Sequence, residues 1–257
     1  MEAASPTAQV RYRRWLPYWA VFQADVRQTL CSWVYRVWVL VSVLVAVGYL
    51  LYSRGAAQEA GIIQPASLLI SDLLRWTLFG SVTLIIVLTT GSISAERGTL
   101  ADSVLCRGIS RYQYFLGKWH ARLATVLGTF VVMGTAALIG SVVLLHEDLS
   151  PAGSAIALFA VVAMLAAVVS CGVTVSAISN NTLLGIVFLW LTLYGAGFVL
   201  TLLPESVPSP DRILHRLPHV LRGHYDLVSI ARLGAWSLLG SFLVALIGMI
   251  AFSRRDV

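Results

Sequence analysis

The sequence predicts an all-α membrane protein with six transmembrane helices, and three observations lead to that fold class. Hydrophobic residues make up 58% of the chain and charged residues 12%, whereas a soluble domain carries about 25% charged residues. The mean hydropathy is +0.82. The apolar residues lie in long blocks, each close to the ~20 residues that cross the hydrocarbon as a helix. Inside a bilayer, backbone groups must be satisfied within the segment, so these blocks become helices.

The N-terminal segment, residues 1–33, is expected to be cytoplasmic and interfacial. Aromatic and apolar residues recur at near-helical spacing over 15–35, which predicts an amphipathic helix lying in the membrane interface. A positive anchor for the first span, without a separate helix, is the alternative. The side chains expected to act as interfacial anchors over the whole chain are Arg13, Arg14, Trp15, Trp19, Lys118, Arg254 and Arg255.

Six apolar blocks follow in order, and turn residues separate several of them. The predicted spans are 34–52, 76–94, 121–145, 152–178, 183–203 and 235–252. Residues 53–72 are expected to form a short polar loop. Residues 204–234 are expected to form an extracytoplasmic loop, and the whole chain is taken as a single transmembrane domain.

The distribution of arginine predicts the orientation in the membrane. An even number of spans places both termini on one side, and the basic residues near both termini and between the second and third spans fall on that side. The positive-inside rule makes it cytoplasmic, although the arginines within 204–234 run against the rule. We therefore expect a multi-pass protein of the cell membrane. The net charge of +6 could suggest a nucleic-acid partner, but the arginines lie beside apolar blocks and not on one polar face, so none is expected.

The centres of the predicted spans hold no acid, lysine or histidine. An ion-coupled carrier needs titratable groups at membrane depth, and an intramembrane enzyme needs a nucleophile with a base, or metal ligands. Both classes are therefore disfavoured, and no cofactor is expected. Any energy for transport has to come from outside the spans.

The cytoplasmic segment 95–120, between the second and third spans, carries the most informative pattern. Thr99 and Asp102 have the spacing of a capping arrangement, which predicts a short helix that Gly108 ends. Ser110 is expected to cap the next helix. The apolar stripe of the short helix suits docking into a groove of another protein or lying on lipid headgroups, and the pattern alone favours neither.

Several residues of this segment resemble the permease subunits of type-two ATP-binding-cassette exporters. The similarity lies in Glu96, Gly98-Thr99-Leu100, Leu105, Ser110-Arg111 and Gly117-Lys118, and in the ending Phe252-Ser-Arg-Arg-Asp256. The resemblance implies that 95–120 is a coupling segment that sits on a separate ATPase subunit. The coupling residues that it implies are Glu96, Arg97, Gly98, Thr99, Leu100, Asp102, Val104, Leu105, Arg107, Ser110 and Arg111.

The resemblance further implies a six-span permease that pairs with a second permease copy, with the substrate passing between the two. ATP hydrolysis is not expected in this chain, because a phosphate-binding loop needs a leading glycine and a Ser or Thr after Gly-Lys. Here Tyr112 stands at the glycine position, and Trp119 follows Lys118. The expected partners are therefore an ATPase subunit, a second permease copy and membrane lipid.

Two alternatives stay open beside the export permease. One is a membrane scaffold or maturation factor, for a metalloenzyme or envelope system, that uses the same fold without transport. The other, less favoured, is an intramembrane enzyme. Three histidines in the last loop, His215, His219 and His224, are weak candidates for a metal site, because Pro218 interrupts them and no cysteine or firmly placed acid completes a ligand set. No metal is therefore expected.

Overall fold

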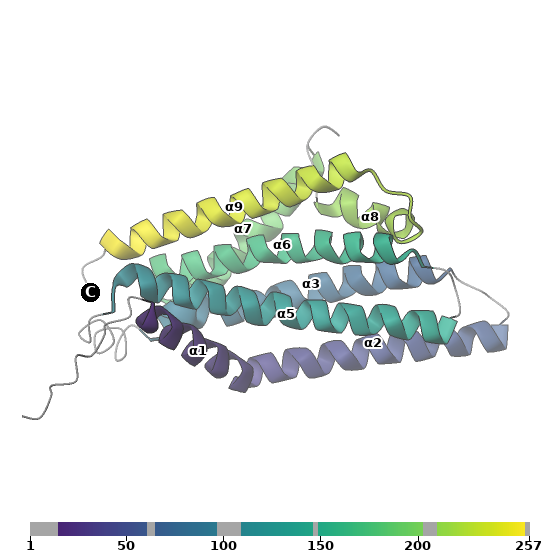
Figure 1. Ribbon diagram of the computed structural model, residues 1–257, viewed down its shortest axis with the longest axis horizontal. Coiled ribbons are helices and arrows are strands. Elements are labelled where there is room, and N and C mark those ends of the chain that lie inside the picture. Colours follow the sequence, from purple (N-terminus) through teal and green to yellow (C-terminus); the bar gives the residue numbers. More distant parts are fainter. Residues whose placement is uncertain (1–14, 61–64, 97–108, 146–148, 203–209, 255–257) are drawn as a thin grey trace, which may run out of the picture.

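The computed structural model describes residues 15–60, 65–96, 109–145, 149–202 and 210–254, and over these ranges the chain is helical without strands. Figure 1 shows the long helices lying side by side along the long axis, with α1 slanting across one end. The helices are α1 (Leu16–Cys31), α2 (Trp33–Ala60), α3 (Ala66–Ser94), α5 (Arg111–Leu145), α6 (Pro151–Ile178), α7 (Thr182–Leu202), α8 (Pro210–Leu221) and α9 (Leu227–Arg254).

Six of these helices, α2, α3, α5, α6, α7 and α9, are long and apolar enough to cross a membrane, as predicted. Three of them, α3, α5 and α9, begin well before the predicted spans, and the start of α5 at Arg111 agrees with the cap expected at Ser110. Helix α3 begins at Ala66 because Pro65 precedes it and accepts the first backbone hydrogen bonds. Helix α9 begins at Leu227 because the Asp226 carboxylate accepts bonds from the Val228 amide and the Ser229 hydroxyl. Residues that resembled loop sequence are therefore the starts of helices.

Helix α6 is the centre of the bundle. In its most apolar stretch of 18 residues 67% of the residues are buried, whereas the corresponding share is 11% for α2 and for α7. It packs most closely on α9 and α3. Glycines make these approaches possible, because a Cβ at Gly172 would collide with Thr89 of α3, and a Cβ at Gly248 of α9 would press on Thr174. Small residues at helix contacts are the usual means of packing in a membrane, where the hydrophobic effect does not drive helices together.

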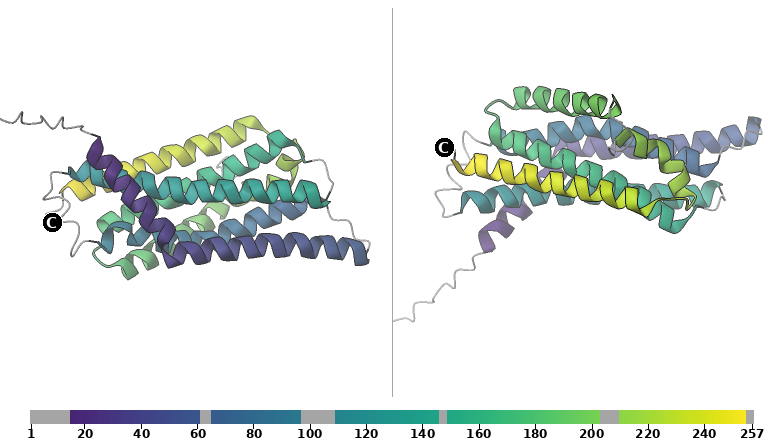
Figure 2. Two further views of the ribbon diagram at one scale, coloured as in Figure 1. Left: turned by 60° about the horizontal axis from the view of Figure 1, so that its bottom comes forward. Right: turned by 90° about the horizontal axis from the view of Figure 1, so that it is seen from above.

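Helix α1 crosses one end of α5 obliquely and meets α2 at a bend (Figure 2). The bend lies at Ser32, whose extended backbone ends α1. The stretch 15–35, predicted as one amphipathic helix, is thus divided between α1 and the start of α2. Gly117 of α5 lets α1 approach closely, since a Cβ there would lie 2.9 Å from Val21 Cγ1.

The region predicted as the last loop, 204–234, contains helix α8 and the first turns of α9. One face of α8 buries Leu214, Leu217 and Leu221 against the bundle, while His215 and His219 are exposed on the other. The carbonyl of Leu221 accepts a hydrogen bond of 3.0 Å from the Ser150 amide. This part of the chain is therefore an amphipathic helix packed across α3 and α6.

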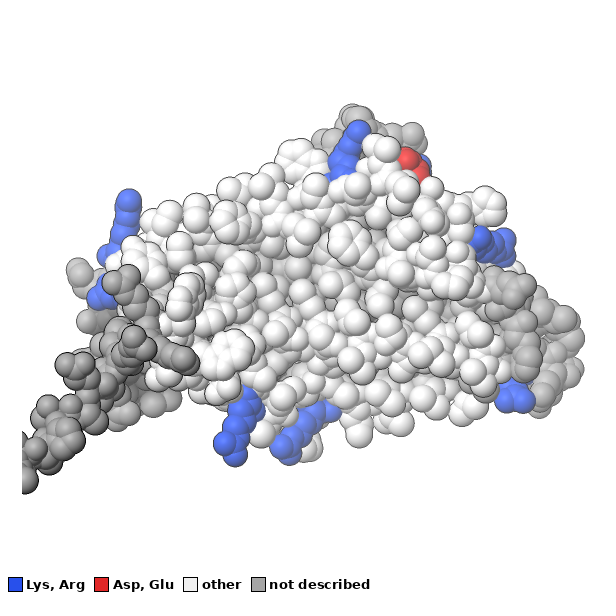
Figure 3. Space-filling view, in the orientation of Figure 1, with Lys and Arg blue, Asp and Glu red and all other residues white. Residues whose placement is uncertain are grey.

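The face seen in Figure 3 is largely uncharged. Basic side chains lie at the two ends of the bundle and along the edge where α1 meets α2. A belt of exposed apolar side chains covers α2, α7 and α9, including Val47, Phe198 and Phe242. This distribution is the one that a protein surrounded by hydrocarbon requires.

The close contact between α3 and α6 yields a test of the fold. We expect Gly172→Ala to destabilise the protein by about 1–3 kcal/mol, because the added methyl group has to displace Thr89. Thermal unfolding in detergent micelles measures the effect. Gly195→Ala on α7 is the matched control, since a Cβ there has nothing within 4 Å. Equal midpoints for the two variants would show that α3 and α6 do not approach as described.

Candidate functional site

Four ionisable side chains meet inside one end of the bundle and are here called the charge cluster: Asp25 of α1, Glu96 just after α3, and Lys118 and Arg122 of α5. The side chains of Asp25, Lys118 and Arg122 are 1%, 3% and 7% exposed, and that of Glu96 is 13% exposed. Two acids and two bases balance each other. Each has an oppositely charged partner, as buried charges require.

Lys118 is at the centre of the charge cluster. Its Nζ lies 2.7 Å from Glu96 Oε2 and 3.2 Å from Asp25 Oδ1, and it donates a 2.7 Å hydrogen bond to the Ser92 carbonyl. An ammonium group has three donors, and here all three have acceptors. The sequence predicts Lys118 as an interfacial anchor, whereas its side chain is buried and joins three segments of the chain.

Arg122 lies one helical turn after Lys118 and holds the other side of Asp25. Its Nη2 donates a 3.1 Å hydrogen bond to Asp25 Oδ1, and its Nε lies 3.0 Å from Asp25 Oδ2. The second contact is electrostatic, because its geometry is not that of a hydrogen bond. Asp25 therefore ties α1 to two successive turns of α5.

Glu96 stays ionised within this arrangement. Burial disfavours its charge, but the Lys118 ammonium, the Tyr114 hydroxyl and the Gln28 side chain outweigh burial and lower the pKa of its carboxyl group. Tyr114 donates a 2.8 Å hydrogen bond to Glu96 Oε2. Tyr114, Lys118 and Arg122 are four residues apart, so they form one stripe along α5.

The charge cluster is also connected to the central and last helices. The backbone amides of Ile93 and Ser94 donate to the Ser176 hydroxyl of α6 at 2.8 and 3.0 Å. The Tyr114 ring stacks on Phe252 of α9 with centroids 5.9 Å apart, and Arg111 donates to the Ser253 carbonyl. The ends of α1, α3, α5, α6 and α9 are therefore held by one set of contacts.

Glu96 and Ser110 lie on either side of the segment 97–108. Ser110 caps α5 as expected, because its hydroxyl accepts from the Gln113 amide at 3.2 Å and the Gln113 side chain accepts from the Ser110 amide at 3.3 Å. Of the predicted coupling residues, only Glu96, Ser110 and Arg111 are described, and the structure brings Glu96 and Arg111 to the same end of the bundle. The remainder lie outside the described residues: Arg97, Gly98, Thr99, Leu100, Asp102, Val104, Leu105 and Arg107.

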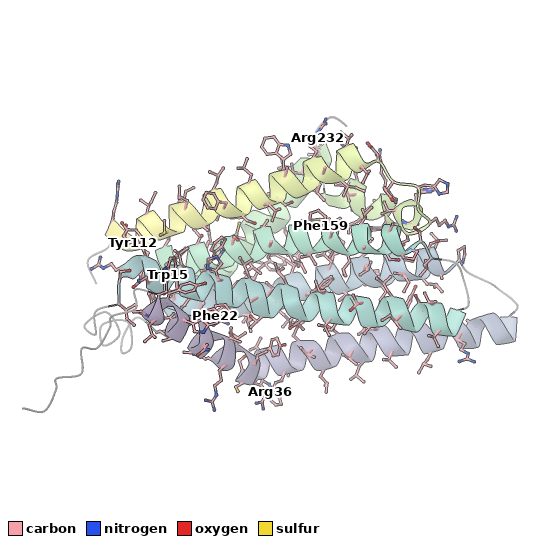
Figure 4. All side chains as sticks on the ribbon, viewed as in Figure 1. Trp15, Phe22, Arg36, Tyr112, Phe159 and Arg232 are labelled. Carbon is pink, nitrogen blue, oxygen red and sulfur yellow. The ribbon has the colours of Figure 1, made fainter. Side chains whose placement is uncertain are left out.

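The predicted anchors are only partly within the described ranges. Trp15, just before α1, and Trp19 of α1 are 75% and 54% exposed, and Arg254 at the end of α9 is exposed. Figure 4 shows Trp15 at the same end of the bundle as Tyr112. Arg13, Arg14 and Arg255 lie outside the described residues.

The histidines of the predicted outer loop do not form a metal centre in the described chain. His215, His219 and His224 are all exposed, and His215 Nε2 lies 3.5 Å from Asp211 Oδ2 one turn earlier. Over the described ranges, no three His, Cys, Asp or Glu side chains lie close enough to hold a metal ion.

The sequence prediction missed Asp25 and Arg122 as site residues. Asp25 is an acid within the N-terminal helix, next to a chain end rich in arginine, and Arg122 follows the chain's single lysine at helical spacing. These two signals suggest partners for Lys118, but the sequence does not show that α1 folds back across α5. Without knowledge of that contact, the sequence pattern around each charged residue is that of an isolated residue in the membrane interface.

The pairing within the charge cluster yields the next test. We expect Asp25→Asn to lower the free energy of unfolding by about 3–5 kcal/mol, because it removes the acid that pairs with both Lys118 and Arg122. Chemical unfolding in detergent micelles measures the loss. Asp72→Asn is the control, since Asp72 is exposed on α3. A loss no greater than that of the control would contradict the pairing.

Two comparisons with known proteins give no match to this chain. No model of a known protein family matches it, and none of the curated proteins matches it. A function therefore has to be inferred from the chain's own residues.

Proposed function

We propose that this chain is the permease subunit of an ATP-driven exporter, which forms a substrate path with a second permease copy and is powered by a separate ATPase subunit. The proposal joins the resemblance of residues 96–118 to type-two exporter permeases with the position of the charge cluster. One observation carries it: Glu96, which directly precedes the segment 97–108 that would contact the ATPase, forms a 2.7 Å ion pair with Lys118.

The charge cluster is suited to transmitting force. Glu96, just after α3, and Ser110, just before α5, stand on either side of residues 97–108, and α5 carries Lys118. A displacement of this segment would pull on both ends of the Glu96–Lys118 pair at once. Buried, charge-assisted contacts resist separation more strongly than exposed ones do, so the movement would pass to α3 and α5 as whole helices.

Helix α1 would take part in this transmission as a brace. Asp25 holds it to α5 through Lys118 and Arg122, and the Tyr18 hydroxyl lies 3.1 Å from His120 Nδ1. We propose that α1 lies along the cytoplasmic interface, with Trp15 and Trp19 in the headgroup region, where the amphipathic rings of tryptophan are enriched. A movement of α5 would then carry α1 and the start of α2 with it.

The second permease copy is placed against α7 in this proposal. Only Gly185 and Leu189 of that helix are buried within the described chain, and α7 carries Gly195 and Gly197 with no atom within 4 Å of an added Cβ. Small residues allow close helix approach in a membrane. Thr83 of α3 and Tyr194 of α7, whose hydroxyls are 3.4 Å apart, would line the adjoining path.

Coupling can be tested on the complete protein. We expect an ATPase to co-purify with the chain in mild detergent. In that complex, nucleotide is expected to change the distance between spin labels at Val132 and Leu191. Lys118→Met and the milder Glu96→Gln are expected to keep the ATPase bound. Because each breaks a buried ion pair, each is expected to lower about tenfold the equilibrium constant of the nucleotide-dependent movement that this distance reports.

Arg254→Gln is the control, because Arg254 is exposed at the same end of the bundle. The absence of any co-purifying ATPase would refute the proposal. An ATPase that binds without any nucleotide-dependent change in the wild-type chain would favour the non-transporting scaffold.

The placement of the second copy has its own test. After the native cysteines are replaced by alanine, Leu191→Cys on α7 is expected to cross-link two chains in vesicles under oxidation. Val132→Cys on α5 is the matched control, since the two positions are 60% and 67% exposed. Equal cross-linking at both positions, or at Val132 alone, would contradict an interface at α7.

A further inference from the structure

A groove of about 870 Å³ runs between α2 and α5 on one flank of the bundle, with α1 at one end. Its lining on α2 extends from Tyr35 to Leu51, a length of about 24 Å along a helix. One leaflet of a bilayer contributes a hydrocarbon depth of about 15 Å. The groove is therefore long enough to take a whole acyl chain.

The groove is chemically suited to hydrocarbon and not to a polar ligand. Its lining is aliphatic and aromatic apart from Tyr35, Thr125 and Thr129. The Tyr35 and Thr129 hydroxyls bond each other at 2.7 Å, and Thr125 donates to the Ala121 carbonyl. Thr129 in turn donates to the Thr125 carbonyl, so each of the three hydroxyl protons already has an acceptor within the protein and the groove offers a polar ligand no free donor.

The groove also opens outward, toward the lipid. Val47 and Leu51 on α2 are 50% and 56% exposed, and Val132 on α5 is 67% exposed. Gly128 leaves additional space in the wall, because a Cβ there would have nothing within 4 Å. A chain could therefore enter from the side without displacing any helix.

Two exposed arginines flank the α1 end of the groove. Arg27 lies between the groove residues Val26 and Leu30 of α1. Arg36 lies between the groove residues Tyr35 and Val39 of α2. Figure 4 places Arg36 where α1 meets α2, the edge along which Figure 3 shows basic side chains. Over the described ranges neither arginine forms an ion pair.

We propose that this groove is a binding site for an anionic glycerophospholipid of the surrounding bilayer. One acyl chain would lie between α2 and α5, and Arg27 and Arg36 would bind the phosphate by charge-assisted hydrogen bonds. The site rests on the membrane spans and on these contacts, not on the proposed ATPase partner. It would hold the α1–α2 bend next to the charge cluster.

Photolabelling in vesicles tests the site. The full chain is placed in phosphatidylcholine vesicles that contain a trace of phosphatidylglycerol with a diazirine in one acyl chain, or phosphatidylcholine with the same chain. Labelling of residues 124–140 is measured by mass spectrometry and normalised to that of α9, whose side chains Leu239, Phe242 and Leu243 are exposed. We expect phosphatidylglycerol to label the groove about tenfold or more above phosphatidylcholine, since each arginine near the surface favours an anionic lipid.

Two kinds of variant distinguish binding of the lipid headgroup from binding of the acyl chain. The double variant Arg27→Gln/Arg36→Gln is expected to lower phosphatidylglycerol labelling to the level of phosphatidylcholine, while Arg254→Gln, at the same end of the bundle, leaves it unchanged. Gly128→Leu is expected to abolish groove labelling by both lipids. Gly48→Leu is its matched control, because Gly48 has equal free space but does not line the groove.

Three outcomes would overturn the proposal. Equal labelling of the wild-type groove by the two lipids would show that the arginines do not select an anionic headgroup. Full labelling of Gly128→Leu would place the lipid elsewhere, and Val132→Trp, at an exposed position, serves the same purpose if the leucine variant does not fold. Cross-linking of two chains through Val132→Cys would make the groove a contact between copies.

Discussion

The burial of the Lys118 ammonium is the constraint on which one end of this bundle depends. A charge removed from water costs several kcal/mol unless it is paired and fully hydrogen-bonded. Lys118 meets that requirement only through Glu96, Asp25 and the Ser92 carbonyl. These groups come from α1 and from the end of α3, so the lysine is satisfied only when both elements meet α5. The charge cluster thereby holds α1 and the end of α3 against α5.

The remainder of the bundle is held by close packing around α6. Gly172 brings α6 against Thr89 of α3, and Thr174 reaches α9 by donating to the Val244 carbonyl at 2.9 Å. Two helices pack loosely by comparison, α2 and α7. They leave two kinds of outer surface: an apolar groove beside α2, flanked by arginines, and the exposed apolar surface of α7. In our proposals the first binds lipid and the second contacts another copy of the chain.

Much of the architecture was predictable because hydrocarbon imposes strong rules on sequence. Six apolar blocks became six long helices, and Ser110 caps α5 through the bonds that its spacing from Gln113 allows. The errors have local causes. Asp226 resembled loop sequence but caps α9, and α3 begins at Ala66, before the charged residues Asp72 and Arg75. The region of α8 was assigned to a loop because Pro218 and its polar residues concealed the buried stripe of Leu214, Leu217 and Leu221.

The sequence by itself determined that the chain has six blocks long and apolar enough to cross a membrane as helices. These properties follow from composition and local spacing, which a bilayer converts directly into helices. Only the tertiary structure decided that Lys118 is a buried junction and that Asp25 and Arg122 are its companions. Asp25 and Lys118 are far apart along the chain, and a contact between them exists only because Gly117 lets α1 cross α5 closely. No local pattern encodes that crossing.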